Sequence, residues 1–377
     1  MPEQARARRS LHLTIMQNAE MGFLVNMCAM DIKIMLRKVC AGLLTIILLV
    51  AAFVGCSGGA PASQSPPGAQ SDALPVSETR LFLSTFCTLT LYGEHDSSLL
   101  EEAFDLCAEY DALFSRTLEG SDVWRINHAG GAAVIVAPET IEVIKAGVGF
   151  GEISEGMFDI TIGRVSALWD FSNDPHLPSE AELADARAGV DYRQVSIEGD
   201  TVRLLDAEAW LDLGGIAKGY IANRVADYLV ERGVTGAVID LGGDVAVIGE
   251  KPDGSPWLVG VRKPFGGKDD LIGIIETAEA SVVTSGIYQR MFQENGIIYH
   301  HILDPFTGTP SGTDVVSAAV VVQDSAVGDA LSTIAVLVGS EAAPGIFAQT
   351  PGFIGAILML ESGELMQLGD IDFLTLD

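Results

Sequence analysis

Apolar residues recur at helical spacing in several parts of the chain. They fall three and four positions apart, as on one face of an amphipathic helix. Pro138 stands near the first turn of one such segment, and Gly233 follows the last turn of another, where these residues favour helix ends. The pattern predicts helices over residues 97–114, 138–153, 216–232, 325–338 and 341–349.

Short runs of β-branched, aromatic and aliphatic residues separated by turn residues predict strands. Asn295-Gly296 is a strong hairpin turn, and Glu198-Gly199-Asp200 predicts a hairpin across residues 193–205. Strands are predicted over residues 81–92, 237–241, 245–248, 257–262, 271–276, 281–284, 297–302 and 315–322, with a closing hairpin of 354–360 and 364–368. Strands outnumber helices and often follow one another directly. The pattern therefore favours an α+β fold with mixed, largely antiparallel sheets and packed helices over a doubly wound parallel fold.

The first 55 residues predict a targeting segment. Residues 39–55 form an uncharged apolar run that follows Arg37 and Lys38 and ends in small residues, which is typical of a secretory signal. A membrane-spanning anchor is the alternative, but a run of about seventeen residues is at the lower limit for crossing a bilayer. Met30 or Met35 would make a normal signal start, so residues 1–29 are an overcalled start or an extended leader.

The residues after the apolar run predict a lipid anchor. Phe53-Val54-Gly55-Cys56 resembles the bacterial lipobox, in which cleavage before the cysteine leaves its thiol to carry lipid. Residues 56–79 are rich in Gly, Ser and Pro and predict a flexible tether before a globular domain over 80–377. We therefore expect an extracytoplasmic protein anchored to the bacterial cell membrane through Cys56, with plain secretion as the alternative.

Composition narrows the classes of function. The chain has 51 acidic and 22 basic residues, and without residues 1–55 it has 48 and 16, a formal net charge of −32. That charge argues against nucleic-acid binding, which needs clustered Lys and Arg. A hydrophobic content of 48% is too high for a disordered acidic chain. Cys87 and Cys107 are predicted to be buried thiols, although a disulfide between them remains open.

The segment from Asp212 to Tyr220 is a candidate anion site. Asp212 closes a predicted strand, Gly214 and Gly215 permit a tight turn, and Lys218 falls in the first turn of the next helix. A helix N-terminus offers unpaired N–H groups and the positive end of the helix dipole, and Lys218 would add a point charge. The alternative is a plain strand–turn–helix connection with an exposed lysine.

Asp329 and Thr333 form a candidate magnesium site. They lie four residues apart on a predicted helix and so share one face. A carboxylate and a hydroxyl are oxygen ligands that suit Mg²⁺. The alternative from spacing alone is an N-cap aspartate beside a threonine that faces the core.

The pair His300-His301 and the turn after it supply a candidate base. Adjacent residues in a strand face opposite sides, so at most one histidine enters a given site. It can act as a general base or hold a phosphate; a surface histidine is the alternative. Zinc is not expected without further His or Cys at ligand spacing. Residues 154–163 place an aromatic ring, an acid and a hydroxyl in a turn that is predicted to lead into a strand.

Together these segments closely resemble the family of FAD:protein FMN transferases, the flavin transferases of the ApbE type. The resemblance spans about Leu81 to Gly339, and the ordered set of motifs is highly specific. The motifs in chain order are Phe114-Ser115, Arg125-Ile126-Asn127, residues 156–163, Leu168-Trp169-Asp170-Phe171, residues 212–220, Asp240-Leu241-Gly242-Gly243-Asp244, residues 285–290, residues 301–308 and residues 329–333.

The resemblance implies Mg²⁺-dependent transfer of FMN from FAD to a Thr or Ser hydroxyl of an acceptor protein, with release of AMP. The acceptor would be a membrane-associated or extracytoplasmic flavoprotein. His301 and Asp329 would be catalytic, and the metal ligands would be the Gly215 carbonyl, Asp329 and Thr333. The FAD contacts would be Thr117, Met157, Phe158, Asp159, Asp212, Lys218, Ser285, Tyr288, His301 and Leu303.

A site that binds a diphosphate in this way is also compatible with two other functions. If water replaces the acceptor hydroxyl, the site becomes a Mg²⁺-dependent FAD pyrophosphatase that yields FMN and AMP. A flavin-binding lipoprotein without turnover is the third reading, and it would not need a metal at the diphosphate. The chain also departs from the family pattern at Leu83-Ser84-Thr85, where Met-Gly-Thr is usual, at Arg116-Thr117, where a Tyr is common, and at Gly215, where Ala is common.

Overall fold

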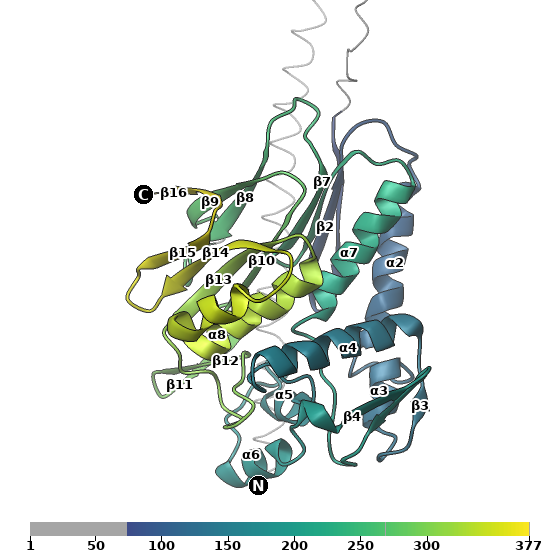
Figure 1. Ribbon diagram of the computed structural model, residues 1–377, viewed down its shortest axis with the longest axis vertical. Coiled ribbons are helices and arrows are strands. Elements are labelled where there is room, and N and C mark those ends of the chain that lie inside the picture. The colour runs from purple at the N-terminus through teal and green to yellow at the C-terminus, as the bar shows by residue number, and fades with distance from the viewer. Residues whose placement is uncertain (1–73, 268, 377) are drawn as a thin grey trace, which may run out of the picture. The chain divides into compact units, whose positions relative to one another are not determined.

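The computed structural model describes residues 74–376 except residue 268 (Figure 1). The predicted signal segment, Cys56 and most of the predicted tether lie outside this range. The described residues after residue 69 form one compact unit.

The centre of this unit is an eight-stranded sheet in which every neighbouring pair is antiparallel. The strands, in their order across the sheet, are β1 (Val76–Phe82), β2 (Thr85–Leu91), β6 (Gly236–Leu241), β7 (Asp244–Gly249), β10 (Ser281–Gly286), β13 (Val315–Val322), β14 (Phe353–Leu360) and β15 (Leu365–Gly369). The predicted α+β class with largely antiparallel sheets is confirmed.

Both faces of the sheet are covered around β13. Ala318, Val320 and Val322 belong to the main core, which also contains α2 (Leu99–Phe114), α7 (Ala217–Glu231) and α8 (Ser325–Phe347). The alternate residues Ala319 and Val321 belong to a second core with β8 (Trp257–Arg262) and β9 (Leu271–Thr277). Because successive side chains point to opposite faces, helices cover one face of the sheet and β8 and β9 cover the other (Figure 1).

The smaller elements complete the fold. Strand β16 (Asp372–Thr375) pairs with β9, and β3 (Val134–Ile135), β4 (Val195–Glu198) and β5 (Thr201–Leu204) form a separate sheet. Strands β11 (Met291–Glu294) and β12 (Ile297–His300) form a two-stranded sheet. The other helices are α3 (Asp122–Asn127), α4 (Pro138–Ile153), α5 (Gly163–Trp169), α6 (Glu180–Arg187) and the 3₁₀ turn Tyr192–Gln194.

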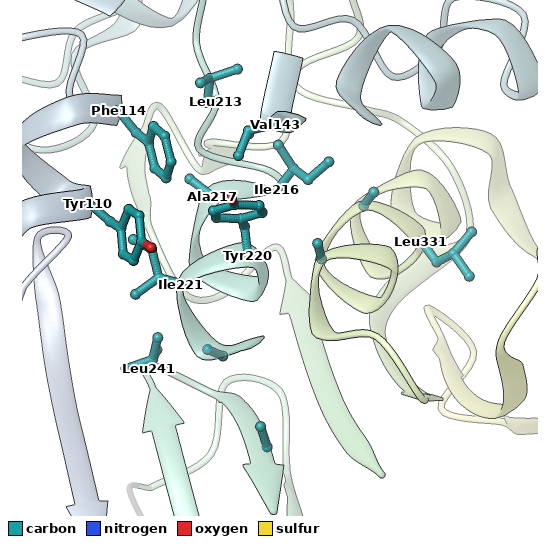
Figure 2. Packing of buried hydrophobic residues seen from close by; sticks show 14 of the residues in the cluster. Tyr110, Phe114, Val143, Leu213, Ile216, Ala217, Tyr220, Ile221, Leu241 and Leu331 are labelled. Atoms are coloured by element: carbon teal, nitrogen blue, oxygen red, sulfur yellow. The ribbon is translucent and has the colours of Figure 1, made fainter. Parts of the chain in front are cut away.

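Aromatic packing fixes the start of α7. Tyr220 packs edge-on against Tyr110 and Phe114 of α2, with ring centroids 5.9 and 5.6 Å apart (Figure 2). On another side of α7, Gly219 lies so close to α8 that a Cβ built there would be 2.1 Å from the Ser325 carbonyl oxygen. The residues next to Gly219 therefore lie directly against α8.

A methyl group at Gly219 is expected to separate α7 from α8. Because the clash is with backbone, Gly219→Ala should lower the free energy of unfolding by about 1–3 kcal/mol. Gly149→Ala is the matched control, since a Cβ at this glycine of α4 meets nothing within 4 Å. It should raise stability by about 0.5–1 kcal/mol through helix propensity. Urea denaturation of both variants checks the difference, and equal effects would contradict it.

Several elements of the structure differ from the predicted ones. The single strand predicted over 81–92 is wrong: it is the hairpin β1–β2, which turns at Leu83 and Ser84 with φ of 53° and 58°. A two-residue turn of this kind usually contains Asn or Gly, and neither stands here. Residues 154–163 lead into helix α5, not into the predicted strand. The short elements α3, α5, α6 and β16 were not predicted.

Other predictions at helices are confirmed. Gly339 has φ 82° and ψ 173°, which breaks α8 where the sequence predicts two helices. By length and composition α8 is the one described helix that can cross a membrane, but 56% of its apolar window is buried inside the fold, as in a core helix. Cys87 and Cys107 are buried free thiols, and burial raises their pKa to about 11 and about 12.

Candidate active site

A cavity of about 920 Å³ brings the predicted site residues together. This volume lies in the range of small-molecule sites. The predicted nucleotide, metal and reaction-centre residues all line it: Thr117, Met157, Phe158, Asp159, Asp212, Gly215, Lys218, Ser285, Tyr288, His301, Leu303, Asp329 and Thr333. Segments up to about 216 positions apart thus meet at one place, which no local pattern in the sequence reveals.

Lys218 and two aspartates form the charged centre of the cavity. The Lys218 Nζ donates to Asp329 Oδ1 at 2.8 Å and lies 3.1 Å from Asp244 Oδ2. Burial lowers the pKa of Lys218, but the two carboxylates outweigh this and hold it above its usual value. Lys218 is thus a positive charge fixed by α8 and β7, not the exposed lysine of the alternative reading. An ammonium has three donors, so at least one is left for a ligand.

Asp329 is the anion at the start of α7. Its Oδ2 accepts from the Gly219 N–H at 3.2 Å. Because α7 and α8 approach closely at Gly219, the Asp329 carboxylate lies at the positive N-terminal end of α7. Asp329 is 1% exposed and lies in the second turn of α8. The N-cap of α8 is Asp324, which accepts from Ala326 N and Val327 N. The alternative reading of Asp329 as an N-cap is therefore wrong.

Asp244 is a member of this centre that sequence reasoning gave no role. It is 2% exposed at the start of β7, and burial, with the charge of Asp329 added, raises its pKa despite the nearby Lys218. A carboxylate after Gly242 and Gly243 looks like an ordinary turn residue in the sequence. Only the pairing of β7 inside the sheet puts it beside Lys218.

Gly215 and Thr333, the other two residues of the predicted metal site, lie close to each other. Thr333 Oγ1 is 3.3 Å from Ser285 Oγ, and a Cβ built on Gly215 would lie 3.7 Å from Thr333 Oγ1. The described residues hold no group of three His, Cys, Asp or Glu side chains that could bind a metal. The predicted donors are a carboxylate, a hydroxyl and a backbone carbonyl, an all-oxygen set of the kind that fits Mg²⁺.

His301 supplies a neutral imidazole to the cavity. Burial, with the charge of Arg290, lowers its pKa to about 3, and its Nδ1 has no hydrogen-bond partner among the described residues. His300 is absent from the cavity wall, and one of its ring nitrogens, Nε2, lies 3.0 Å from the Ser311 carbonyl oxygen. Although β12 ends at His300, the two histidines have different surroundings and only His301 lines the cavity, as the sequence predicts.

The low pKa of His301 makes stability depend on pH. Between its ordinary value of 6.5 and about 3, the unfolded chain binds a proton at this imidazole and the folded chain does not. Its contribution to stability is therefore complete above pH 6.5 and is lost as the pH falls toward about 3. On acidification from about pH 7 to about pH 4, His301→Gln should lose less melting temperature than the parent protein. Parallel losses in thermal scans would refute this.

Asp212 is held in place by Arg116. The Arg116 Nε donates to Asp212 Oδ2 at 3.1 Å, and Asp212 Oδ1 accepts from Gly214 N at 2.9 Å. Asp212 does not close a strand, which corrects the sequence prediction: only an isolated bridge at Trp210 precedes it. Arg116 was missed as a site residue. Its position is one where the sequence departs from the pattern of the family that it resembles, and that departure is the signal that could have identified it.

The loop of residues 157–159 lines the cavity, but the Asp159 carboxylate is used within the protein. Its Oδ1 accepts from the backbone and hydroxyl of Thr161 at 2.8 and 2.6 Å, and its Oδ2 accepts from Tyr192 N at 2.9 Å. Burial raises the pKa of Asp159. We therefore assign Asp159 to holding the loop that carries Phe158, and not to a charged contact with nucleotide.

The other predicted residues form the walls. Tyr288 lies over Gly286, where a Cβ would be 2.3 Å from its ring. Leu303 is buried in a small cluster with Trp169, and the Thr117 N–H donates to Ser115 Oγ at 3.3 Å. The cavity is therefore lined by both apolar and polar side chains.

Comparison with known proteins gives one consistent result. The model of the ApbE family matches residues 83–358. The FAD:protein FMN transferase of Treponema pallidum is 31% identical over 76% of this chain and 84% of its own length, and that of Klebsiella pneumoniae is 35% identical over 72% and 85%. The crystal structure of the ApbE protein of Thermotoga maritima has a TM-score of 0.72 at 31% identity, covering 78% of this chain and 97% of its own. The flavin transferase ApbE of Vibrio cholerae has a TM-score of 0.69 at 26% identity, covering 78% and 96%.

Proposed function

The chain belongs to the ApbE family, and we propose that it is an FAD:protein FMN transferase that uses Mg²⁺ and a Thr or Ser hydroxyl of an acceptor protein. The acceptor oxygen forms a bond to the phosphorus of the FMN moiety. The bond from that phosphorus to the AMP oxygen breaks, and AMP leaves. The product is a flavin joined to the acceptor through a phosphoester.

The observation that carries the proposal is the meeting of three kinds of group in one cavity. Lys218 offers a fixed positive charge, Asp329 and Thr333 offer metal-binding oxygens, and His301 offers a neutral nitrogen without a partner among the described residues. Transfer to a hydroxyl needs charge neutralisation at the diphosphate and a group that takes the hydroxyl proton. A passive flavin binder needs neither.

Each of these residues has a defined task. Lys218 binds a diphosphate oxygen through its remaining donor, while Asp244 and Asp329 fix its position. Arg116 orients Asp212 toward FAD. His301 accepts the proton of the acceptor hydroxyl through its neutral imidazole, which lines the cavity. Mg²⁺, held by Gly215, Asp329 and Thr333, would neutralise diphosphate charge when bound.

The acidity of the protein makes these local groups necessary. A chain with a formal net charge of −32 after residue 55 repels FAD, which is itself an anion. The overall field therefore cannot supply the affinity. We expect both binding of FAD and transfer to depend strongly on a divalent cation.

The test is covalent labelling. The purified protein is mixed with FAD, Mg²⁺ and a candidate acceptor, and the flavin fluorescence of the denatured acceptor is measured after electrophoresis. Fluorescence that survives denaturation, with AMP in equal amount, supports the transferase. Free FMN and AMP without label indicate a pyrophosphatase, and unchanged FAD indicates a binding protein.

We also propose that the protein is extracytoplasmic and carries lipid on Cys56. The basic residues Arg37 and Lys38, the apolar run and the small residues before Cys56 support this. An acceptor near the membrane surface would then lie within reach of the site. Metabolic labelling with an alkyne fatty acid should mark the protein and not its Cys56→Ser variant, and labelling of both would contradict the anchor.

A further inference from the structure

Arg290 lies between two other residues of the cavity wall. Its Nη2 donates to the Leu83 carbonyl oxygen at 3.4 Å, and its own carbonyl oxygen accepts from the His301 N–H at 3.1 Å. All three residues line the cavity. The charge of Arg290 also reaches the imidazole, where it adds to the effect of burial in lowering the pKa of His301. The guanidinium therefore lies at the wall beside the proposed base.

The other cations of the cavity each have a carboxylate nearby. Among the described residues, four Lys and Arg side chains line the cavity. Lys218 and Arg116 form ion pairs with aspartates of the site. Burial raises the pKa of Asp240, and the charge of Arg262 opposes that rise. Arg290 is the fourth cation, and it forms no ion pair with a described residue.

An unpaired cation is unexpected in this protein. The chain after residue 55 has 48 acidic and 16 basic side chains, a ratio of three to one. Arg290 is partly buried, and a guanidinium keeps its charge at every relevant pH. Of its five N–H donors, one is used by a described residue, the Leu83 carbonyl. The remaining donors and the charge are therefore available to an anion that enters the cavity.

The position of Arg290 indicates which anion this is. The acceptor hydroxyl must come within hydrogen-bond reach of His301 while its oxygen attacks the phosphorus of the FMN moiety. A cation close to the imidazole is thus also close to the phosphate that is transferred. Guanidinium groups bind phosphate oxygens through two parallel N–H donors. A carboxylate of the acceptor is the other anion that could pair with Arg290, and the test below separates the two.

We propose that Arg290 is a further catalytic residue, whose guanidinium binds the non-bridging oxygens of the transferred phosphate through two N–H groups. The inference rests on the proposed transferase function. While the bond from the acceptor oxygen to phosphorus forms and the bond to the AMP oxygen breaks, Arg290 neutralises charge on the non-bridging oxygens. The acceptor proton goes to His301, and Arg290 transfers none. Its charge keeps the free imidazole neutral, and the bound phosphate offsets that charge.

Two substitutions separate the charge of Arg290 from its hydrogen bond to Leu83. Arg290→Gln keeps an amide donor for the Leu83 carbonyl and loses the charge, whereas Arg290→Lys keeps the charge and loses the paired donors. At saturating FAD and acceptor, the rate of transfer should fall about a hundredfold in Arg290→Gln and about tenfold in Arg290→Lys. A role only in holding the turn between β1 and β2 predicts equal effects.

Arg203→Gln is the matched control. Arg203 also donates to a backbone carbonyl, that of Gly131, at 2.7 Å, but it is exposed and lies outside the cavity wall. This variant should keep the parent rate of transfer.

Binding measurements without transfer test the phosphate contact directly. FMN and riboflavin differ by one phosphate, and quenching of flavin fluorescence measures the affinity of the protein for each. Arg290→Gln should weaken binding of FMN roughly tenfold and change binding of riboflavin less than about twofold. Arg203→Gln should change neither affinity.

The outcomes separate this inference from the function on which it rests. If the parent protein labels no acceptor, the transferase function fails, and the affinities for FMN and riboflavin still test the phosphate contact. A parent rate in folded Arg290→Gln, or equal losses in Arg290→Gln and Arg290→Lys, would overturn the proposal. A raised KM for the acceptor with unchanged FMN affinity would assign Arg290 to an acceptor carboxylate and overturn it as well. If thermal scans show that Arg290→Gln does not fold, Arg290→Lys decides, and a parent rate in that variant would exclude the paired contact.

Discussion

Asp329→Ala is expected to reduce covalent flavin transfer roughly a thousandfold. The carboxylate has three tasks: it pairs with Lys218, accepts from the Gly219 N–H and supplies the one charged oxygen of the proposed metal set. Without this carboxylate, Lys218 keeps only Asp244 as an ion-pair partner, and the N-terminus of α7 loses the negative charge that faces it. Transfer to an acceptor, measured by denaturation-resistant fluorescence, and Mg²⁺ binding, measured by calorimetry with FAD present, should be lost together.

Controls separate this loss from unfolding. Removing one partner of a buried ion pair is destabilising, so the melting temperature of Asp329→Ala must be compared with that of Asp329→Asn, which keeps the shape. Asp227→Ala, at an exposed ion pair of α7, is the matched surface control and should keep activity. Full transfer by folded Asp329→Ala would refute the assignment of Asp329 as a metal ligand.

His301→Gln is expected to lower the rate of transfer by about 10²–10⁴ while leaving FAD binding nearly unchanged. The imidazole has a pKa of about 3 in the protein alone, so it is neutral and able to accept a proton throughout the physiological range. The negative diphosphate of bound FAD favours the protonated form and raises this pKa toward the range where a general base works well.

Two measurements check this role. In the protein without FAD, the NMR signals of the His301 imidazole should not change between about pH 5 and about pH 8. When FAD binds, the pKa of His301 measured in the same way should rise. His300→Gln is the control, because His300 lies outside the cavity wall and should retain transfer. A His301→Gln variant with the parent rate would remove His301 from the reaction.

Local patterns in the sequence determine much of the fold. Helical spacing predicts α2, α4, α7 and α8, and the glycine at 339 marks the break in α8. Asn295-Gly296 predicts the turn between β11 and β12, where both residues have positive φ. The turn at Leu83 and Ser84 was missed because these residues carry no local signal for a left-handed conformation. Contacts with Arg290 and Asp111 from other segments hold that turn.

The residues of the site, like the elements of the fold, were predicted from the sequence only in part. Residue types and their order predict which segments carry chemistry: helical spacing puts Asp329 and Thr333 on one face, the family resemblance implies their role, and His301 follows from alternation and from the family motif. The pairing of Lys218 with Asp244 does not follow, because the two lie on different elements and meet only when β7 enters the sheet beside α7.

The sequence by itself determined the α+β class, the family and the segments of the site, because periodicity and motif order are local properties. The tertiary structure alone decided what each side chain does. It placed Asp329 at the N-terminus of α7, used the Asp159 carboxylate to hold a loop and paired Arg116 with Asp212. These depend on distances between segments far apart in the chain, which only packing of the helices against the sheet fixes.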